Sequence, residues 1–191
     1  INKPSDDPGG LAVSMKLKNA ITVTEATKRN VDNALSYTDT QDSALESVAD
    51  ILDRMSTIKT SYGSGTATTS DLSSYASEFK ELQKQLDVFK SETFNSLSLF
   101  SFSAVSKQVM ISSRGESGPT ISISTLDISG ALSVSSTINL ANATGSVTIS
   151  GISIGNLTTA ITQVASLRAT SGATSSRLQF SSDFLDTSKT N

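Results

Sequence analysis

Apolar residues recur at spacings of three and four positions through the first third of the chain. Residues 11–62 contain neither glycine nor proline, the residues that most reliably interrupt a helix. An average globular helix has only about 11 residues, so this stretch predicts one long helix, on the order of 80 Å at ~1.5 Å per residue. Asp6, Asp7 and Pro8 are the expected start, with capping carboxylates and a residue of fixed φ. The expected packing face comprises Leu17, Ala20, Val31, Ala34, Leu45, Val48, Leu52 and Met55, widened by Ile51, Ile58 and Tyr62 and diluted by Thr24, Thr27, Thr38 and Gln41.

Acidic residues form a seven-residue repeat on another face of the same predicted helix. Glu25, Asp32, Asp39, Glu46 and Asp53 are each seven positions apart, which aligns their carboxylates. One interpretation is a solvated face. The other is an electrostatic edge that contacts a neighbouring subunit.

Two further helices are predicted later in the chain. After a linker over residues 63–70, apolar residues alternate by three and four up to Phe89, with Ser70 and Asp71 as expected caps. A short linker favours antiparallel packing of this helix on the first. The third helix is expected after Gly155, with Asn156 as its cap, and its apolar positions are Leu157, Ile161, Val164, Leu167, Leu178 and Leu185.

The hydrophobic period changes to two between the second and third helices. Turn-forming residues 115–119 separate two alternating stretches, so Gln108–Thr125 is predicted to be a β-hairpin. A weaker hairpin is expected across Gly151, pairing residues 147–149 with 152–154.

The predicted fold is mainly α with a small β region, an elongated bundle of long antiparallel helices plus β-hairpins. We expect N-terminal helices over residues 1–96 and a β-hairpin region with a short variable insert over 97–154. A third helix over 155–191 is expected to pack on 1–96, which makes one elongated domain.

Composition excludes several classes of function. The chain has no cysteine or histidine and only 36% hydrophobic residues, so thiol, imidazole and most transition-metal chemistry is excluded, and we predict no catalytic, cofactor-binding or metal-binding residues. The net charge is −3 without a basic run, which argues against nucleic acid or an anionic membrane as a partner. No apolar run reaches the ~18 residues of a membrane span. No signal peptide is expected, and the first residue, Ile1, suggests a processed chain.

Four motifs, in this order, resemble those of bacterial flagellins. They are INKPSDDPGGLA at the start, Thr93-Phe94-Asn95 closing the second helix with Ser96 in the place of a glycine, ISSRGESGPTISIS over 111–124, and VASLRATSGATSSRL over 164–178. The resemblance implies the flagellin rod domain without its terminal coiled-coil segments. It also implies export to the cell exterior and polymerisation with copies of itself into a helical propeller filament, and it implies that the truncated chain is a monomer. Asp39, Glu46 and Asp53 are the acidic residues expected to contact neighbouring subunits.

Flagellins are also recognised by a Toll-like innate immune receptor, and the matching stretch here is LDRMSTIKTS over 52–61. Arg54 is kept and Ile58 stands for a leucine, but Thr57 occupies the place of a glutamate, and Gln85 falls where the family often has one. An arginine anchor in an interface usually needs a carboxylate or aromatic partner, and the loss of flanking charges weakens such pairing. Since the two glutamates of the family pattern are replaced here, we predict weakened receptor activation.

Two other classes of protein stay open at this stage. The hook–filament junction protein shares the rod, although it usually carries a glycine- and tyrosine-rich segment where this chain has SLSLFSFSA. A secreted coiled-coil adhesin or needle component is the second. A zinc protease is excluded because it needs two histidines.

Overall fold

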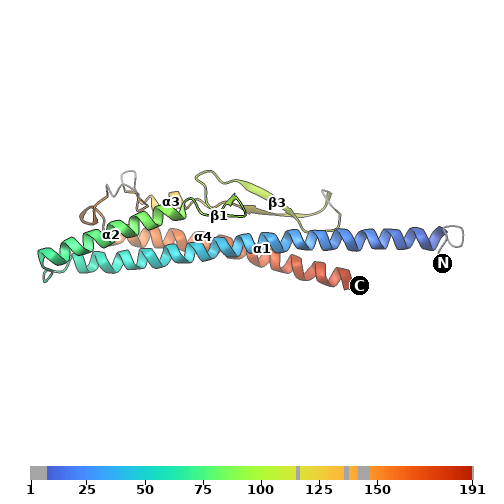
Figure 1. Ribbon diagram of the computed structural model, residues 1–191, viewed down its shortest axis with the longest axis horizontal. Coiled ribbons are helices and arrows are strands. Elements are labelled where there is room, and N and C mark those ends of the chain that lie inside the picture. Colours follow the sequence, from blue (N-terminus) through green and yellow to red (C-terminus); the bar gives the residue numbers. More distant parts are fainter. Residues whose placement is uncertain (1–7, 115–116, 136–137, 142–146, 191) are drawn as a thin grey trace. The chain divides into compact units, whose positions relative to one another are not determined.

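The computed structural model describes residues 8–114, 117–135, 138–141 and 147–190 (Figure 1). As predicted, these residues are mainly helical with small strand pairs. The helices are α1 (Pro8–Tyr62), α2 (Thr69–Phe89), α3 (Ile128–Leu132), the 3-10 turn η2 (Ile149–Gly151) and α4 (Ile154–Thr190). The strands are β1 (Thr93–Phe94), β2 (Leu97–Ser98), β3 (Ser106–Met110) and β4 (Thr120–Ser124).

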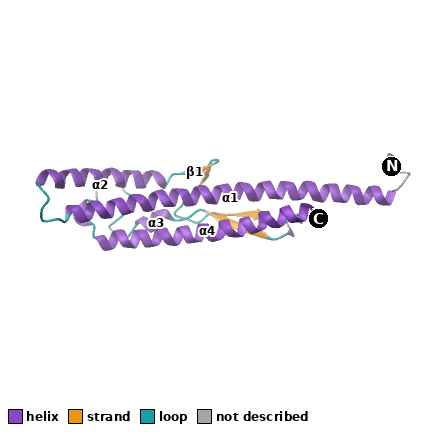
Figure 2. Ribbon diagram, turned by 90° about the horizontal axis from the view of Figure 1, so that it is seen from below, coloured by secondary structure: helices purple, strands orange, loops and turns teal. Residues whose placement is uncertain are grey.

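Helix α1 is a single element of 55 residues, and Figure 2 draws it without interruption. It begins at Pro8, whose fixed φ suits the first turn of a helix, and it takes in Gly9 and Gly10. The long helix predicted from the lack of helix breakers is therefore confirmed. The predicted caps Asp6 and Asp7 lie outside the described residues.

Helix α2 begins at Thr69, before both of its predicted caps, Ser70 and Asp71. Thr68 is the N-cap, and it forms a capping box with Asp71: the Asp71 amide donates to Thr68 Oγ1 at 3.2 Å, and the Thr68 amide donates to Asp71 Oδ2 at 2.9 Å. The hydrogen bond from the Thr68 hydroxyl is the main reason that the pKa of Asp71 is lowered. Asp71 thus serves as the third residue of the first turn, and the assignment of Ser70 and Asp71 as caps is corrected.

The Thr93–Ser96 motif does not close the second helix. Helix α2 ends at Phe89, and β1 and β2 form an antiparallel pair in which Thr93 faces Ser98 and Phe94 faces Leu97. Asn95 and Ser96, at the turn, have φ of 48° and 63°. Two consecutive positive φ values are the signature of a tight hairpin turn, which explains why glycine is favoured at the position that Ser96 occupies.

The predicted hairpin over Gln108–Thr125 is present, since β3 and β4 form a second two-stranded sheet. The second predicted hairpin is wrong. Residues 149–151 form η2, and α4 begins at Ile154. The apolar alternation there arises because Ile149 and Ile152, 3% and 1% exposed, fill the core from an irregular segment.

Helix α4 starts with a reciprocal pair of side-chain hydrogen bonds. The Asn156 amide donates to Ser153 Oγ at 3.1 Å, and the Ser153 amide donates to Asn156 Oδ1 at 2.9 Å. Ser153 therefore caps the helix, and Asn156 supports the cap from within the first turn. The sequence predicted Asn156 itself as the cap.

The described chain divides into two compact units. Unit 1 comprises residues 1–36, 107–123 and 174–191, and unit 2 comprises 37–106 and 124–173. The domain limits expected at residues 96 and 154 stay a prediction.

Unit 2 holds the larger core. Its fully buried side chains come from α1, α2, α4 and the segments between them; they include Leu45, Leu52, Met55, Phe79, Leu86, Leu99, Ile128, Leu132, Leu140, Ile152 and Leu157. Such continuous apolar packing is the main source of folding free energy.

Unit 1 has a leaner core in which small polar residues replace aliphatic ones. Its buried residues are Thr24, Thr27, Val31, Ala34, Val109, Ile121, Ile123, Leu178, Ser182 and Leu185. The predicted packing face of α1 is therefore confirmed from Thr24 onward. It is wrong at Leu17, which is 60% exposed, and at Ala20, which is also exposed, because no described segment covers this part of the helix.

Candidate subunit-contact surface

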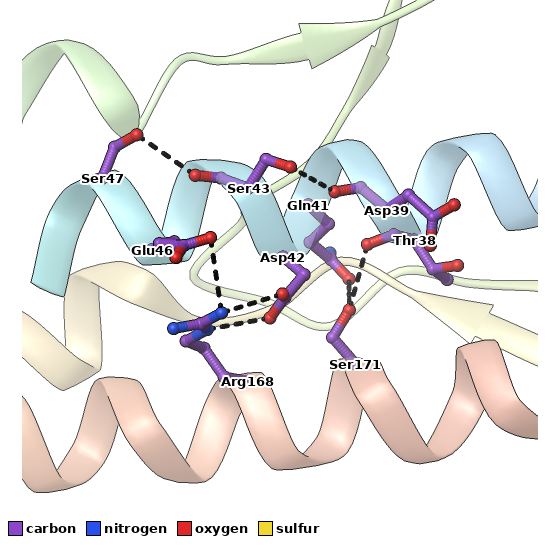
Figure 3. Close-up of polar contacts among 9 residues, drawn as sticks. All are labelled: Thr38, Asp39, Gln41, Asp42, Ser43, Glu46, Ser47, Arg168 and Ser171. Carbon is purple, nitrogen blue, oxygen red and sulfur yellow. Dashed lines mark hydrogen bonds and ion pairs between the residues drawn. The ribbon is translucent and has the colours of Figure 1, made fainter.

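Arg168 on α4 connects to two carboxylates of α1 within unit 2 (Figure 3). Its Nε and Nη2 atoms donate to the two carboxylate oxygens of Asp42, each at 3.0 Å, and Nη2 lies 3.6 Å from Glu46 Oε2. The hydrogen bonds to Asp42 are the main reason that the pKa of Arg168 is raised. This two-pronged contact matches the planar guanidinium group, so it fixes the register of the two helices.

Beside this ion pair lies a buried polar cluster. Gln41, 2% exposed, donates from Nε2 to the backbone oxygen of Leu99 at 2.7 Å and to that of Ser124 at 3.2 Å. Ser171 Oγ lies 3.2 Å from the Thr38 carbonyl oxygen and 3.4 Å from Gln41 Oε1. The amide and hydroxyl groups satisfy one another and nearby backbone, as buried polar groups must, so this cluster has a structural role.

Lys28 is the centre of a comparable polar cluster in unit 1. Its Nζ atom lies 3.0 Å from Asp186 Oδ2, 3.6 Å from Asp32 Oδ2 and 3.2 Å from Ser182 Oγ. The Ser182 hydroxyl in turn donates to Asp32 Oδ1 at 3.0 Å. The hydrogen bond to Asp186 is the main reason that the pKa of Lys28 is raised. This cluster links α1 to α4 within unit 1.

The predicted acidic row is divided between contacts inside the chain and exposed positions. Glu25 pairs with Lys189 at 2.8 Å, and its pKa is lowered mainly by that hydrogen bond. Glu46 lies beside Arg168 but keeps 62% of its side chain exposed. Asp39 and Asp53 are exposed. Part of the acidic row therefore forms ion pairs between α1 and α4. Neither a solvated face nor a contact with a neighbouring subunit, the two interpretations of the sequence, predicted these pairs.

The cations that meet these carboxylates were not singled out from the sequence. Arg168 and Lys189 lie beside the apolar positions of α4, as Lys28 does on α1. Charged residues that flank a helical seam often pair across it, and this is the signal that could have identified them.

The predicted receptor-contact residues differ in how far they are exposed and in what they contact. Arg54 Nε and Nη2 each lie 2.7 Å from Glu78 Oε1 on α2, and the Arg54 side chain is 55% exposed. Ile58 is 2% exposed and belongs to the core, so its side chain is not available on the surface. Gln85 is exposed. Only Arg54 and Gln85 are accessible, and Arg54 already has a carboxylate partner.

Exposed apolar side chains lie in both units, and those of unit 1 follow one another along α1 and α4. On α1 they are Leu11, Val13, Met15, Leu17 and Ile21, with exposures from 39% to 65%, and on α4 they are Phe180 and Phe184, 73% and 65% exposed. A groove of about 570 Å³ follows α1 past Val13, Leu17 and Ile21, with the smaller Gly10 and Ser14 between them. Contiguous exposed apolar side chains of this kind mark interaction surfaces.

The described residues form neither a metal-binding group nor a membrane-spanning helix. In the described part of the chain, no group of three or more His, Cys, Asp or Glu residues could hold a metal ion. No helix within the described ranges is long and apolar enough to span a membrane.

Comparison with known proteins adds evidence from sequence and structure. Residues 1–104 match the family model described as the bacterial flagellin N-terminal helical region. A flagellin of Listeria innocua is 31% identical over 113 residues, which is 59% of this chain and 39% of the relative. A flagellin of Clostridium tyrobutyricum is 32% identical over 106 residues, which is 55% of this chain and 28% of the relative. This chain thus spans less than half the length of these relatives.

The fold is similar to that of a solved flagellin. The crystal structure of Bacillus cereus flagellin superposes with a TM-score of 0.67 at 27% identity, and the match covers 82% of this chain and 88% of that one. Flagellin is a structural protein, which confirms the prediction that the chain is not an enzyme. Since the family model matches more than half of its residues, this chain belongs to the bacterial flagellin family.

Proposed function

We propose that this chain is the rod part of a subunit of the flagellar filament. In this proposal, copies polymerise outside the cell into a helical filament that drives motility. The observation that carries the proposal is the flagellin match over residues 1–104, which contains α1 and its exposed apolar face. A relative from Borreliella burgdorferi, 27% identical over 110 residues, is named a flagellar filament core protein, which supports the same function.

Polymerisation tests this proposal directly. The full-length protein, dissociated to monomers and then returned to polymerising conditions, should form filaments visible by electron microscopy. Deletion of its gene should remove the filaments and swimming, and the wild-type gene should restore both. A full-length protein that labels only the junction between hook and filament would instead support the junction protein. The 191-residue chain alone should sediment as a monomer in analytical ultracentrifugation.

We propose that Asp39, Glu46 and Asp53 add electrostatic contacts between subunits. Each is exposed, and Glu46 lies only at the edge of the Arg168 contact, so its carboxylate can still meet a neighbour. Rim charges of this kind mainly change association rates and salt dependence. Replacing Asp39 and Asp53 with Asn should slow filament growth at low salt and have little effect at high salt. Unchanged growth at both salt concentrations would disprove the contact.

We also propose that this chain activates the innate immune receptor weakly. Arg54 is engaged by Glu78, Ile58 is buried, and Gln85 offers no charge. Because a buried or occupied anchor contributes little to binding, Glu78→Ala should raise signalling in a receptor reporter assay by freeing Arg54, and Glu81→Ala is the matched control. Full activity of the unaltered full-length protein at nanomolar concentration would contradict this proposal.

A further inference from the structure

Unit 2 contains a pocket of about 410 Å³ that takes no part in the ion pairs described above. Its lining comes from Tyr62 at the end of α1, from Ser77 and Lys80 on α2, and from Thr148 and Ser150 beside η2. All of its lining residues belong to unit 2. Pockets of this size hold small organic molecules.

Gln83 is a buried polar side chain that lines this pocket. It is 1% exposed, and its Nε2 atom has no hydrogen-bond partner. Among the described residues, no other buried side-chain nitrogen or oxygen is in this state. Gln41, which is buried to the same degree, donates to two backbone oxygens. Since an unpaired buried donor is unfavourable, the Gln83 amide is suited to donate to a molecule in the pocket.

Lys80 gives the pocket a positive charge. No carboxylate lines the pocket, and Lys80 forms no ion pair with a described residue, whereas Lys84 on the same helix pairs with Glu81 at 2.7 Å. Lys80 and Gln83 are three positions apart on α2, which makes their side chains neighbours on the helix surface. An ammonium and an amide donor can therefore reach one carboxylate, which has two acceptor oxygens.

Hydroxyl groups dominate the remaining polar lining. Ser77 donates its hydroxyl to the Ser73 backbone oxygen at 2.9 Å, so its oxygen is still able to accept. Thr148 and Ser150 have their hydroxyl oxygens 3.0 Å apart, and each oxygen has lone pairs for a further donor. The Tyr62 ring adds an apolar face. This lining favours a ligand whose carbon skeleton carries hydroxyl groups over a purely apolar carboxylate.

We propose that this pocket binds a sugar acid of the hexuronate class. The carboxylate accepts from Lys80 Nζ and Gln83 Nε2, and the sugar hydroxyl groups donate to Ser77 and Thr148. This binding goes beyond the proposed filament function and does not depend on it.

A nuclear magnetic resonance titration of the full-length protein, held as a monomer, tests the proposal with sodium glucuronate. Backbone amide signals of α2 should shift at millimolar glucuronate. Glucose lacks the carboxylate and should bind at least about tenfold more weakly, because the charge-assisted contact with Lys80 is lost. Acetate lacks the hydroxyl groups and should also bind more weakly. No binding of glucuronate up to about 20 mM, or equal affinity for glucose, would overturn the proposal.

Substitutions at the two donors give a second readout. Gln83→Met and Lys80→Met should each weaken glucuronate binding about fivefold or more. The Gln83→Met melting temperature should stay the same or rise, because the change removes a buried donor that has no partner. Lys84→Met is the matched control on the same helix but outside the pocket, and its affinity should be unchanged. Wild-type affinity in both donor variants would overturn the proposal, as would a purely structural effect in which Gln83→Met melts earlier but binds normally.

The side-chain amide of Gln83 distinguishes a ligand from bound water. In protein labelled with ¹⁵N-glutamine, the Gln83 Nε2 signal should shift as glucuronate is added, and its contact with water should decrease. A signal that keeps the same position and the same water contact at every glucuronate concentration would mean that the pocket holds water only, which overturns the proposal.

Discussion

Helix α1 contributes to both units, yet its two parts are covered in different ways. In unit 2 its inward face is aliphatic, and Leu45, Leu52 and Met55 are fully buried. In unit 1 the same face begins with Thr24 and Thr27, and beyond them Leu17 is exposed. Since apolar burial supplies most of the folding free energy, unit 2 is expected to hold most of the stability of the chain.

The same contrast separates stability from interaction. Unit 1 joins α1 to α4 through Lys28, Asp186, Glu25 and Lys189, which are polar and partly exposed contacts of modest strength. It also carries exposed apolar side chains, Val13, Leu17 and Ile21 on α1 and Phe180 and Phe184 on α4. A region with few buried apolar contacts is expected to open locally at a lower free energy than a region with a larger core.

The largest expected effect comes from the same truncation made in each unit. Leu52→Ala in unit 2 and Leu178→Ala in unit 1 both remove a side chain that is 0% exposed. We expect Leu52→Ala to lower the free energy of unfolding by ~3–5 kcal/mol and Leu178→Ala by ~2 kcal/mol, because the leaner core relaxes more easily around the cavity. Urea denaturation followed by circular dichroism measures both. Equal losses would remove the distinction between the units.

A smaller effect is expected from the ion pair of unit 2. Arg168→Met should lower the free energy of unfolding by about 1 kcal/mol, since the contact with Asp42 is two-pronged but about one-third exposed. A double-mutant cycle with Asp42→Asn isolates the pairwise contribution. Arg54→Met is the matched control, and its more exposed pair with Glu78 should contribute ~0.5 kcal/mol or less. A coupling energy of zero between Arg168 and Asp42 would show that the contact does not stabilise unit 2.

Replacing a buried polar side chain of unit 1 with an apolar one, as in the core of unit 2, should stabilise unit 1 slightly. Thr27 is 5% exposed, and Thr27→Val places a methyl group where the hydroxyl lies. The expected gain is ~0.5–1 kcal/mol in the free energy of unfolding. The same change at the exposed Thr22 should have almost no effect. Destabilisation by Thr27→Val would mean that the buried threonine hydroxyl is needed for packing.

The smallest expected effect is a pH dependence that belongs to unit 1. Because Lys189 lowers the folded-state pKa of Glu25 below its ordinary value of 4.5, this pair stabilises the fold above that pH, and the contribution is lost as the pH falls through the lowered pKa. Lys28 behaves oppositely: its folded-state pKa is raised above 10.5, so its contribution is lost as the pH rises past that raised value. Thermal melting measured between about pH 3 and about pH 7, a range that includes the ordinary carboxylate pKa values, tests the Glu25 pair. The melting temperature of Glu25→Gln should fall less on acidification than that of the wild type. An identical acid loss in both proteins would exclude a role for this pair.

Local sequence signals were sufficient for the existence and approximate extent of the long helices. The lack of helix breakers over residues 11–62 and the spacing of apolar positions depend only on neighbours along the chain, and the helices follow them. Caps were less well placed. Thr68 and Ser153 were missed because several adjacent Ser, Thr and Asp residues could each cap, and the backbone angles decide among them.

The candidate site was only partly predictable. The acidic row is visible in the sequence, but which carboxylates meet a cation depends on the register of α4 against α1, which brings Arg168 to Asp42 across 126 residues of chain. The burial of Ile58 agrees with its predicted place on the packing face of the first helix and rules out its predicted use as a surface contact. The turn at Asn95 and Ser96 was hidden, because it depends on backbone angles that ordinary residues rarely adopt.

By itself, therefore, the sequence determined the helices, the mainly α class and the absence of thiol and imidazole chemistry, because these follow from residue type and local period. Only the tertiary structure decided that the apolar seam of α1 is covered from Thr24 onward and exposed at Leu17. Periodicity shows which residues share a face of a helix. What lies against that face depends on segments far away in the chain, and the free energy of burying it is a property of the packed structure.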